Sequence, residues 1–285
     1  MQIKDFFDLV KIRILFSALL TTFFGYSVAL EYRLWNVVDL SWLLIGSCFV
    51  FSASAILNHV LEIDTDSLME RTKFRPLPTK RVTVFNALVL VGVFMLLGLL
   101  ILFFKTNWFV FLNSIGIFVL YNFVYTPLKR LSILNTFVGA FPGAMPLLSG
   151  WFMVQGSLTM FVGLLFLMLY FWQLPHFFSI SWIYKESYEA AQLNMVSVGD
   201  STGIRTRFYL GVSSVLFIIL VYLPLFYGYL GGIYIVAVTI LNIFLMVYIY
   251  KFSLDLNDMI ARKILLITVF YPLIIPLAYV LGILL

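Results

Sequence analysis

Charged side chains are scarce in this chain. Only 11% of its 285 residues are Asp, Glu, Lys or Arg, against about 25% in a typical soluble domain. Hydrophobic residues make up 63%, and the mean hydropathy is +1.06. A soluble globule is therefore excluded, and apolar runs from end to end predict a protein that crosses the membrane many times. The net charge of +5 does not point to nucleic acid, and we predict no such partner.

Cysteine is nearly absent as well, because Cys48 is the only one in the chain. One thiol cannot form an intramolecular disulfide, and its place inside an apolar run predicts a buried structural residue. A removable signal peptide is not expected. The segment Met1 to Val10 is amphipathic and charged, and the apolar run after it is long enough to span the bilayer and remain there.

Long apolar runs are abundant instead, and nine of them have the roughly 17–25 residues that a bilayer core requires. We predict an all-α polytopic membrane protein, a single domain over 1–285. Its nine spans are expected at about 13–30, 41–61, 83–104, 107–126, 133–153, 159–183, 207–228, 231–250 and 264–285. Long polar loops after the second and sixth spans suggest two related halves, at about 1–130 and 131–285.

Basic residues alternate between the regions that these spans separate. Sixteen of the 18 lie on one side, and only Arg33 and Lys105 lie on the other. By the positive-inside rule the base-rich side is cytoplasmic, with the N-terminus inside and the C-terminus outside. The alternation also supports nine spans, because adding or removing one would break it.

The most polar passage follows the second span. If the helix continues there, Asn58, Glu62 and Asp66 lie four residues apart on one slowly turning face. Two carboxylates one turn apart repel each other unless a positive charge lies between them. Their oxygens suit Mg²⁺, which takes one or two carboxylates together with substrate phosphate. A solvated loop helix is the alternative, but the position beside a membrane boundary favours metal binding.

Basic side chains follow these acids. Arg71 and Arg75 are interpreted as diphosphate contacts, because one guanidinium group can donate hydrogen bonds to two phosphate oxygens. Contact with lipid headgroups is the alternative. The end of the fourth span brings Tyr125, Lys129 and Arg130 to the same predicted side. The sequence thus predicts acids and bases together at one mouth of the bundle.

Polar groups also occur in and after the sixth span. Gln173 and His176 lie three residues apart within it, and such groups inside a membrane call for a functional explanation. His176 is a candidate metal or haem ligand, a base, or a histidine satisfied between helices. The following loop carries Lys185, Glu186 and Glu189, which form either a second acidic cluster or a plain solvated loop.

These passages resemble a known family. Asn58-x-x-x-Glu62-x-x-x-Asp66, followed by Met-Glu-Arg-Thr-Lys-Phe-Arg-Pro-Leu from Met69, resembles the first signature of the intramembrane prenyltransferases of the UbiA superfamily. Three later passages resemble its haem-prenylating branch. They are Tyr-Thr-Pro-Leu-Lys-Arg from Tyr125, Val-Gly-Ala-Phe-Pro-Gly-Ala from Val138 and Trp-Gln-Leu-Pro-His-Phe from Trp172.

The resemblance implies a helical bundle with a central cavity open to the cytoplasmic side, in a bacterial-type inner or plasma membrane. It implies transfer of the farnesyl group of farnesyl diphosphate to a vinyl group of haem B, with water addition, giving haem O and diphosphate. Mg²⁺ is the implied cofactor, and haem B is a substrate. Implied partners are membrane lipid and a haem A synthase or terminal oxidase assembly that receives the product.

The resemblance also implies roles for single residues. Asn58, Glu62 and Asp66 become catalytic metal ligands, and His176 becomes a catalytic residue that contacts haem or handles the proton of the incoming water. Glu186 becomes a further metal ligand. The implied diphosphate-binding residues are Arg71, Arg75, Tyr125, Lys129, Arg130 and Lys185.

The chain departs from the family pattern at two positions. The first acid is usually aspartate and here is Glu62, which is longer but still supplies hard oxygen ligands. An aspartate usually precedes Tyr188, and here Ser187 stands in its place, with Glu186 one position earlier. Either Glu186 has taken over its role, or the first loop carries the metal almost alone.

Two other functions are alternatives to this transfer. A sister prenyltransferase acting on an aromatic quinone precursor would share the first signature but would not need the passage at Trp172. A haem or lipid transporter would suit two related halves. A transporter, however, has no need for a cluster of acids followed by arginines.

The departure at Ser187 leads to a test. If Glu186 has replaced the missing acid, the substitution Glu186→Gln lowers prenyl transfer more than the matched substitution Glu189→Gln does, because only the first removes a ligand charge. Initial rates at limiting Mg²⁺ measure the difference. Equal effects of the two substitutions would show that the first loop works without Glu186.

Overall fold

The computed structural model describes residues 2–30, 34–227 and 231–284, and within these ranges it contains helices and no strands. The helices form two compact units, which are described separately. The first unit comprises Met1–Ser157 together with Ser187–Asn194, and the second comprises Leu158–Glu186 together with Met195–Leu285. The expected halves at about 1–130 and 131–285 stay a prediction.

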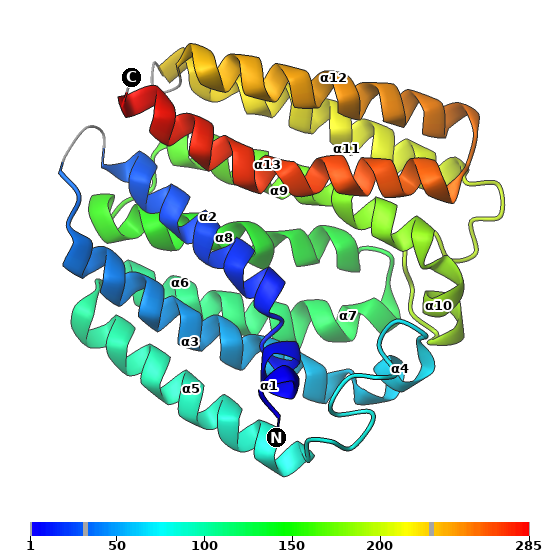
Figure 1. The fold of residues 1–285 in the computed structure, drawn as a ribbon, viewed down its shortest axis with the longest axis horizontal. Coiled ribbons are helices and arrows are strands. Elements are labelled where there is room, and N and C mark those ends of the chain that lie inside the picture. The colour runs from blue at the N-terminus through cyan, green and yellow to red at the C-terminus, as the bar shows by residue number, and fades with distance from the viewer. Residues whose placement is uncertain (1, 31–33, 228–230, 285) are drawn as a thin grey trace. The chain divides into compact units, whose positions relative to one another are not determined.

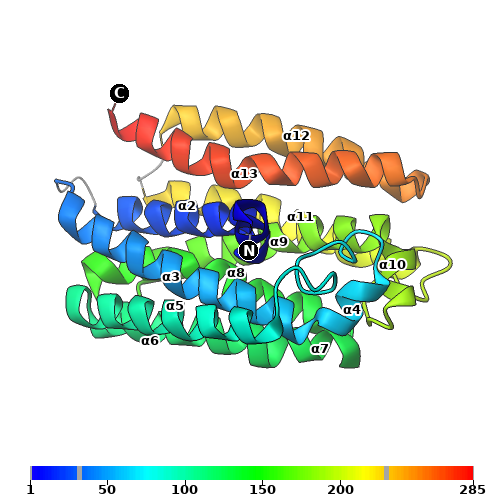
Figure 2. The ribbon, with the colours of Figure 1, turned by 60° about the horizontal axis from the view of Figure 1, so that its bottom comes forward.

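Within its described residues, the first unit has eight α-helices before residue 158 and a π-helical segment, η1 (Figure 1). They are α1 (Ile3–Leu9), α2 (Ile12–Ala29), α3 (Val37–Leu61), α4 (Ile63–Leu68), α5 (Val84–Lys105), α6 (Trp108–Val119), η1 (Leu120–Tyr125), α7 (Thr126–Leu131) and α8 (Asn135–Gln155). Helix α3 packs along α5, and α8 packs against α2 and α6. Figure 2 shows α3 and α5 running side by side.

The second unit is built from α9 (Met160–Ile183), α11 (Ile204–Tyr222), the 3₁₀ segment η2 (Leu223–Tyr227), α12 (Gly232–Leu254) and α13 (Asp258–Leu284). Helix α9 packs against both α11 and α13, and α12 packs against α13. The short helix α10 (Lys185–Ala190) lies where the chain passes between the units.

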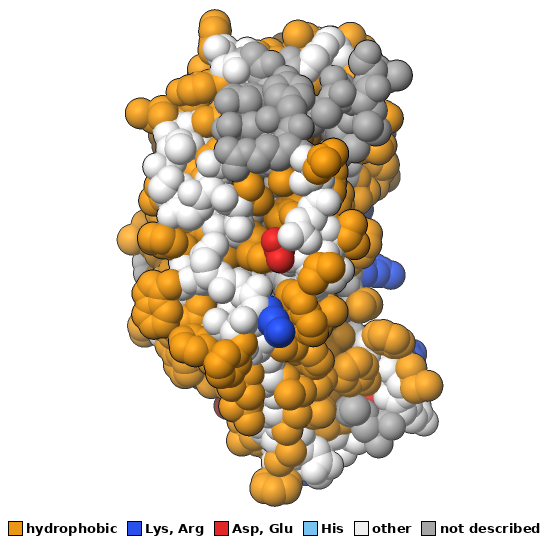
Figure 3. Space-filling view, turned by 90° about the vertical axis from the view of Figure 1, so that its left-hand side faces the viewer, with side chains coloured by type: hydrophobic (Ala, Val, Ile, Leu, Met, Phe, Trp, Pro, Cys, Tyr) orange, Lys and Arg blue, Asp and Glu red, His pale blue; other side chains and the backbone are white. Residues whose placement is uncertain are grey.

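The prediction of an all-α membrane protein is confirmed. Nine helical stretches among the described residues are long and apolar enough to cross a membrane, and each overlaps one of the nine predicted spans. The largest shift is in the last span, which begins at Asp258 rather than near residue 264. Large hydrophobic side chains are exposed along the spans, among them Leu96 and Phe103 of α5 and Ile219 of α11, as expected for contact with lipid. Figure 3 views the left-hand side of Figure 1, where hydrophobic side chains are interspersed with few charged ones.

Small residues allow a close contact between two helices of the first unit. A Cβ atom placed on Gly25 of α2 would lie 2.0 Å from the backbone oxygen of Leu147. A Cβ atom on Gly150 of α8 would lie 2.0 Å from the backbone oxygen of Thr22. Any larger residue at either position would force α2 and α8 apart, which is the role that small residues have between helices in membranes.

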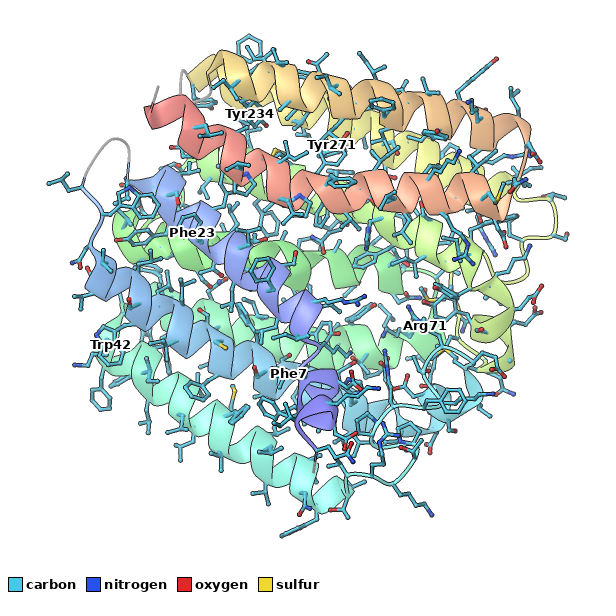
Figure 4. The ribbon with its side chains drawn as sticks, in the orientation of Figure 1. Phe7, Phe23, Trp42, Arg71, Tyr234 and Tyr271 are labelled. Carbon is cyan, nitrogen blue, oxygen red and sulfur yellow. The ribbon has the colours of Figure 1, made fainter. Side chains whose placement is uncertain are left out.

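Basic residues gather at one end of the first unit. Arg81 pairs with Asp5, Lys129 pairs with Glu62, and Arg75 pairs with Asp66. Lys105 lies elsewhere, over the ring of Trp42 near the start of α3. Figure 4 shows Trp42 and Arg71 at opposite ends of this unit. Arg33, which was also assigned to the base-poor side, lies outside the described residues.

Candidate active site

The candidate site begins where α3 ends. The helix is not continuous as expected, because Glu62 (φ −105°, ψ 10°) separates α3 from α4. Even so, the Glu62 N–H donates to the Asn58 carbonyl at 3.0 Å, and the Asp66 N–H donates to the Glu62 carbonyl at 2.8 Å. Four-residue hydrogen bonds therefore persist through the break, and Asn58, Glu62 and Asp66 keep their predicted helical spacing.

All three of these polar side chains are withdrawn from the surface. Asn58 and Asp66 have 0% and 1% of their surface exposed, and the Glu62 side chain is 12% exposed. Buried carboxylates are costly unless they are paired and hydrogen-bonded. A solvated loop helix, the alternative interpretation of this passage, does not describe these residues.

Each of the three side chains contacts a different basic residue. Lys11 Nζ donates to Asn58 Oδ1, and Lys129 Nζ lies 2.6 Å from Glu62 Oε1. Arg75 Nη1 lies 2.9 Å and 2.7 Å from the two carboxylate oxygens of Asp66. The positive charge that the two neighbouring carboxylates require thus comes from Arg75 in the same loop and from Lys129, 67 positions away.

These neighbours determine the protonation of the two acids. Burial would raise the pKa of Glu62, but the charges of Lys129 and Lys11 outweigh burial, and the pKa is lowered. Burial would likewise raise the pKa of Asp66, but the guanidinium group of Arg75, which donates to both carboxylate oxygens, lowers it. Both carboxylates are therefore ionised at neutral pH, which is the form that binds a cation.

Lys11 itself has an unusual environment. Burial lowers its pKa to about 7, and the nearby Arg75 and Lys129 act in the same direction, although Glu62 opposes them. Its ammonium group also lies 3.5 Å from the Tyr121 hydroxyl. Sequence reasoning counted Lys11 only as a topological charge at the edge of the first span, and the structure makes it part of the site.

The π-helical segment η1 orients the amide of Asn58. Pro127 has no N–H, and just before it the Thr126 N–H bonds to Tyr121, five residues back. The Thr126 hydroxyl donates to the Tyr121 carbonyl at 2.8 Å and accepts from Asn58 Nδ2 at 2.8 Å. The amide oxygen of Asn58 therefore faces Lys11. A π-bulge often marks a functional site in this way.

Aromatic side chains complete this polar end. The ring of Tyr125 lies 4.5 Å from Lys129 Nζ, a distance typical of a cation–π contact. A Cβ atom on Gly139 of α8 would lie 2.5 Å from the Tyr125 ring, so glycine makes room for that ring. Tyr188 is buried, and burial raises the pKa of its hydroxyl, although the charges of Arg71 and Lys129 oppose the shift.

The remaining predicted residues are placed less closely. Arg71 is exposed but near enough to Tyr188 for their charges to interact. The Arg130 side chain is exposed, and its backbone carbonyl accepts a hydrogen bond from Asn194. Lys185, Glu186 and His176 belong to the second unit. There the Lys185 ammonium lies 4.3 Å from the centre of the Trp182 ring.

His59 was missed by sequence reasoning although it directly follows Asn58. It is buried, and its Nδ1 lies 3.7 Å from Asp66 Oδ2, longer than a hydrogen bond. Neither ring nitrogen has a hydrogen-bond partner among the described residues. An ionisable side chain one residue from the amide is the signal that could have identified it.

The donor set fits a hard cation. Within the part of the chain that the structure describes, no group of three or more His, Cys, Asp or Glu side chains could hold a metal. Asn58, Glu62 and Asp66 offer two carboxylates and an amide oxygen, which match the few protein ligands that Mg²⁺ takes when a phosphate supplies others. Lys129 and Arg75, which lie beside these oxygens, carry the charge that pairs with a phosphate.

Comparison with known proteins identifies the class. Residues 18–281 match the UbiA prenyltransferase family, to which the chain belongs. A solved digeranylgeranylglyceryl phosphate synthase has the same fold, with a TM-score of 0.79 at 17% identity over 98% of this chain and 97% of that one. A UbiA homologue from Archaeoglobus fulgidus bound to DMAPP and Mg²⁺ gives a TM-score of 0.69 at 17% identity over 97% and 99%.

Curated relatives narrow this class. Protoheme IX farnesyltransferase from Flavobacterium psychrophilum is 33% identical over 98% of this chain and 94% of its own. The enzyme of that name from Listeria innocua is 37% identical over 89% and 84%. The resemblance to the haem-prenylating branch of the superfamily is thereby confirmed.

The contact between Lys129 and Glu62 gives a stability prediction. The substitution Lys129→Met leaves a buried carboxylate without its partner, which is expected to lower the free energy of unfolding by about 3–5 kcal/mol. Adding Glu62→Gln removes the stranded charge, so the double variant should recover most of the loss. Unfolding in detergent micelles measures the wild type, Lys129→Met, Glu62→Gln and the double variant. A double variant no more stable than Lys129→Met would contradict the pairing.

Proposed function

We propose that the chain transfers the farnesyl group of farnesyl diphosphate to a vinyl group of haem B. The allylic C1–O bond breaks, a C–C bond forms to the vinyl group, and water adds to the resulting cation with loss of a proton. The products are haem O and diphosphate. The observation that supports this most directly is the cluster of two carboxylates and an amide, largely withdrawn from the surface and paired with three half-buried bases. It occurs in a chain whose curated relatives are named protoheme IX farnesyltransferase.

The acids and the amide are proposed to bind the metal. Asn58, Glu62 and Asp66 would hold Mg²⁺, with Glu186 as a further ligand on the strength of the family resemblance. When bound, the ion neutralises charge that develops on the diphosphate as it leaves. The hydroxyl of Thr126 keeps the Asn58 oxygen turned toward the site, so this ligand needs little reorganisation.

The bases are proposed to bind the diphosphate. Lys129 and Arg75 are each paired with an oxygen of a proposed metal ligand. When those oxygens bind a cation, the two bases need another anionic partner, and a diphosphate supplies it. Arg71, Arg130, Lys185 and Tyr125 are proposed to add further contacts. Binding of metal and diphosphate together would then keep every buried charge compensated.

The farnesyl chain and the haem require apolar surroundings. We propose a central cavity between the membrane helices that opens at the polar end, where an allylic cation is shielded from early capture by water. His176 is proposed to contact haem or to handle the proton of the incoming water. Haem O would then pass to a haem A synthase or a terminal oxidase assembly.

An assay with defined substrates tests this function. Purified protein in lipid nanodiscs, given haem B, farnesyl diphosphate and Mg²⁺, should produce haem O, identified by mass. The substitution Asp66→Ala should lower kcat/KM at least about 100-fold, as loss of one charge-stabilising group does in other enzymes. Asp64→Ala is the matched control, because Asp64 is exposed two residues away, and it should retain activity.

Other outcomes would point to other functions. Prenylation of 4-hydroxybenzoate in place of haem would assign the chain to the sister prenyltransferases, and uptake of haem without product would favour a transporter. An Asp66→Ala variant with normal activity at limiting Mg²⁺ would overturn the metal assignment.

The sidedness of the membrane protein is a further proposal. We propose that the N-terminus and the polar end of the first unit face the cytoplasm, because sixteen of the 18 bases lie on that side. In a Cys48→Ser background, Ser67→Cys and Ser157→Cys place single thiols at exposed positions on opposite sides. A membrane-impermeant maleimide added to intact cells should label only position 157. Labelling of position 67 alone would reverse the topology.

A further inference from the structure

In the second unit, one residue of α13 contacts two polar side chains of α9. Trp172 and His176 lie one helical turn apart on α9. Trp172 Nε1 donates to the backbone carbonyl of Thr268 at 2.7 Å. His176 Nδ1 lies 3.0 Å from the Thr268 hydroxyl oxygen. Thr268 is fully buried, so these contacts do not compete with solvent.

A proline makes the Thr268 carbonyl available. In an α-helix this carbonyl would accept from the N–H of the residue four positions later. That residue is Pro272, which lies inside α13 and has no N–H. The indole N–H of Trp172 donates to this carbonyl in place of the missing backbone N–H. Thr268 thus offers two acceptors to α9, its carbonyl and its hydroxyl oxygen.

The hydroxyl hydrogen of Thr268 is already committed. The hydroxyl oxygen lies 2.7 Å from the backbone carbonyl of Leu265. Two oxygens approach that closely only with a hydrogen between them, and a carbonyl has none to give. Thr268 therefore donates to Leu265 and can only accept from His176. The 3.0 Å contact then requires a hydrogen on His176 Nδ1.

A neutral imidazole carries one N–H, so a hydrogen on Nδ1 leaves Nε2 with its lone pair. No ion pair of His176 occurs within the described part of the chain, so nothing there favours a doubly protonated ring. The centroid of the imidazole ring lies 5.9 Å from that of Trp172 and 5.8 Å from that of Phe177. Histidines that ligate metals commonly donate their second N–H to a protein oxygen in this way.

We infer that Thr268 is a positioning residue that fixes His176 as the Nδ1–H tautomer and so presents Nε2 as an axial ligand for the iron of the haem substrate. The inference rests on the proposed function, since it takes haem B as the acceptor. The inference assigns a structural role to the polar residues of the passage from Trp172 to His176. Trp172 and His176 attach α9 to α13 through one threonine, and the histidine keeps a single free nitrogen.

The tautomer can be observed without turnover. The chain contains only two histidines, so ¹⁵N-histidine labelling combined with His59→Gln leaves the signals of His176 alone. At alkaline pH the wild-type ring should show a protonated Nδ1 and an unprotonated Nε2. A protonated Nε2 in the wild type would overturn the inference before any change is made at Thr268.

Variants of Thr268 then test its role. Thr268→Val removes the acceptor, so the Nδ1–H tautomer should lose its dominance, and Thr268→Ser should restore it. Thr239→Val is the matched control, because the Thr239 hydroxyl pairs with Tyr222, also in the second unit, and it should leave the His176 signals unchanged. An unaltered tautomer in Thr268→Val would contradict the positioning role.

Haem binding provides the second readout. Haem B added without farnesyl diphosphate should give the absorption spectrum of histidine-ligated iron in the wild type, and His176→Ala should abolish it. Thr268→Val should weaken haem affinity by about 10-fold, the lower end for loss of an orienting partner, and Thr268→Ser should bind normally. A haem spectrum insensitive to both Thr268→Val and His176→Ala, in a protein that makes haem O, would refute this inference alone. Failure to make haem O would refute the proposed function instead.

Discussion

The pairing of buried acids with distant bases is the constraint on which the polar end of the first unit depends. Glu62 and Asp66 are withdrawn from water beside a membrane boundary, where an uncompensated charge is costly. Lys129 is 67 positions from Glu62, and Lys11 is 47 positions from Asn58. These two contacts therefore hold three separate parts of the chain together. With the nearby Arg75 on Asp66, they keep both carboxylates ionised.

Interrupted helices provide the fine positioning in both units. Pro127 follows the π-helical segment in the first unit, and Pro272 frees a carbonyl in the second. In each case a neighbouring threonine hydroxyl donates to a backbone carbonyl of its own helix and turns its lone pairs toward a functional side chain. Thr126 orients Asn58, and Thr268 orients His176. Membrane helices tolerate such interruptions because nearby polar groups satisfy the freed backbone.

The arrangement suits a reaction in which a diphosphate departs inside a membrane. In the proposed function, the bases that neutralise Asp66 and Glu62 in the protein alone would neutralise a diphosphate once those acids bind a cation. The same groups would thus serve stability and catalysis in turn. This dual use of the charged groups agrees with membership of the UbiA prenyltransferase family.

The sequence by itself determined the helical class and the nine spans, because the bilayer fixes the length of an apolar run. It also determined that Asn58, Glu62 and Asp66 share a face, since four-residue spacing is a local property of the backbone. Only the tertiary structure decided which bases meet them and that Thr268 meets His176, 92 residues away. Those partners come from separate helices, and local spacing carries no information about how helices pack. Lys11 shows the difference: the sequence gives it only as an ordinary charge at a membrane boundary, and packing makes it a half-buried partner of Asn58.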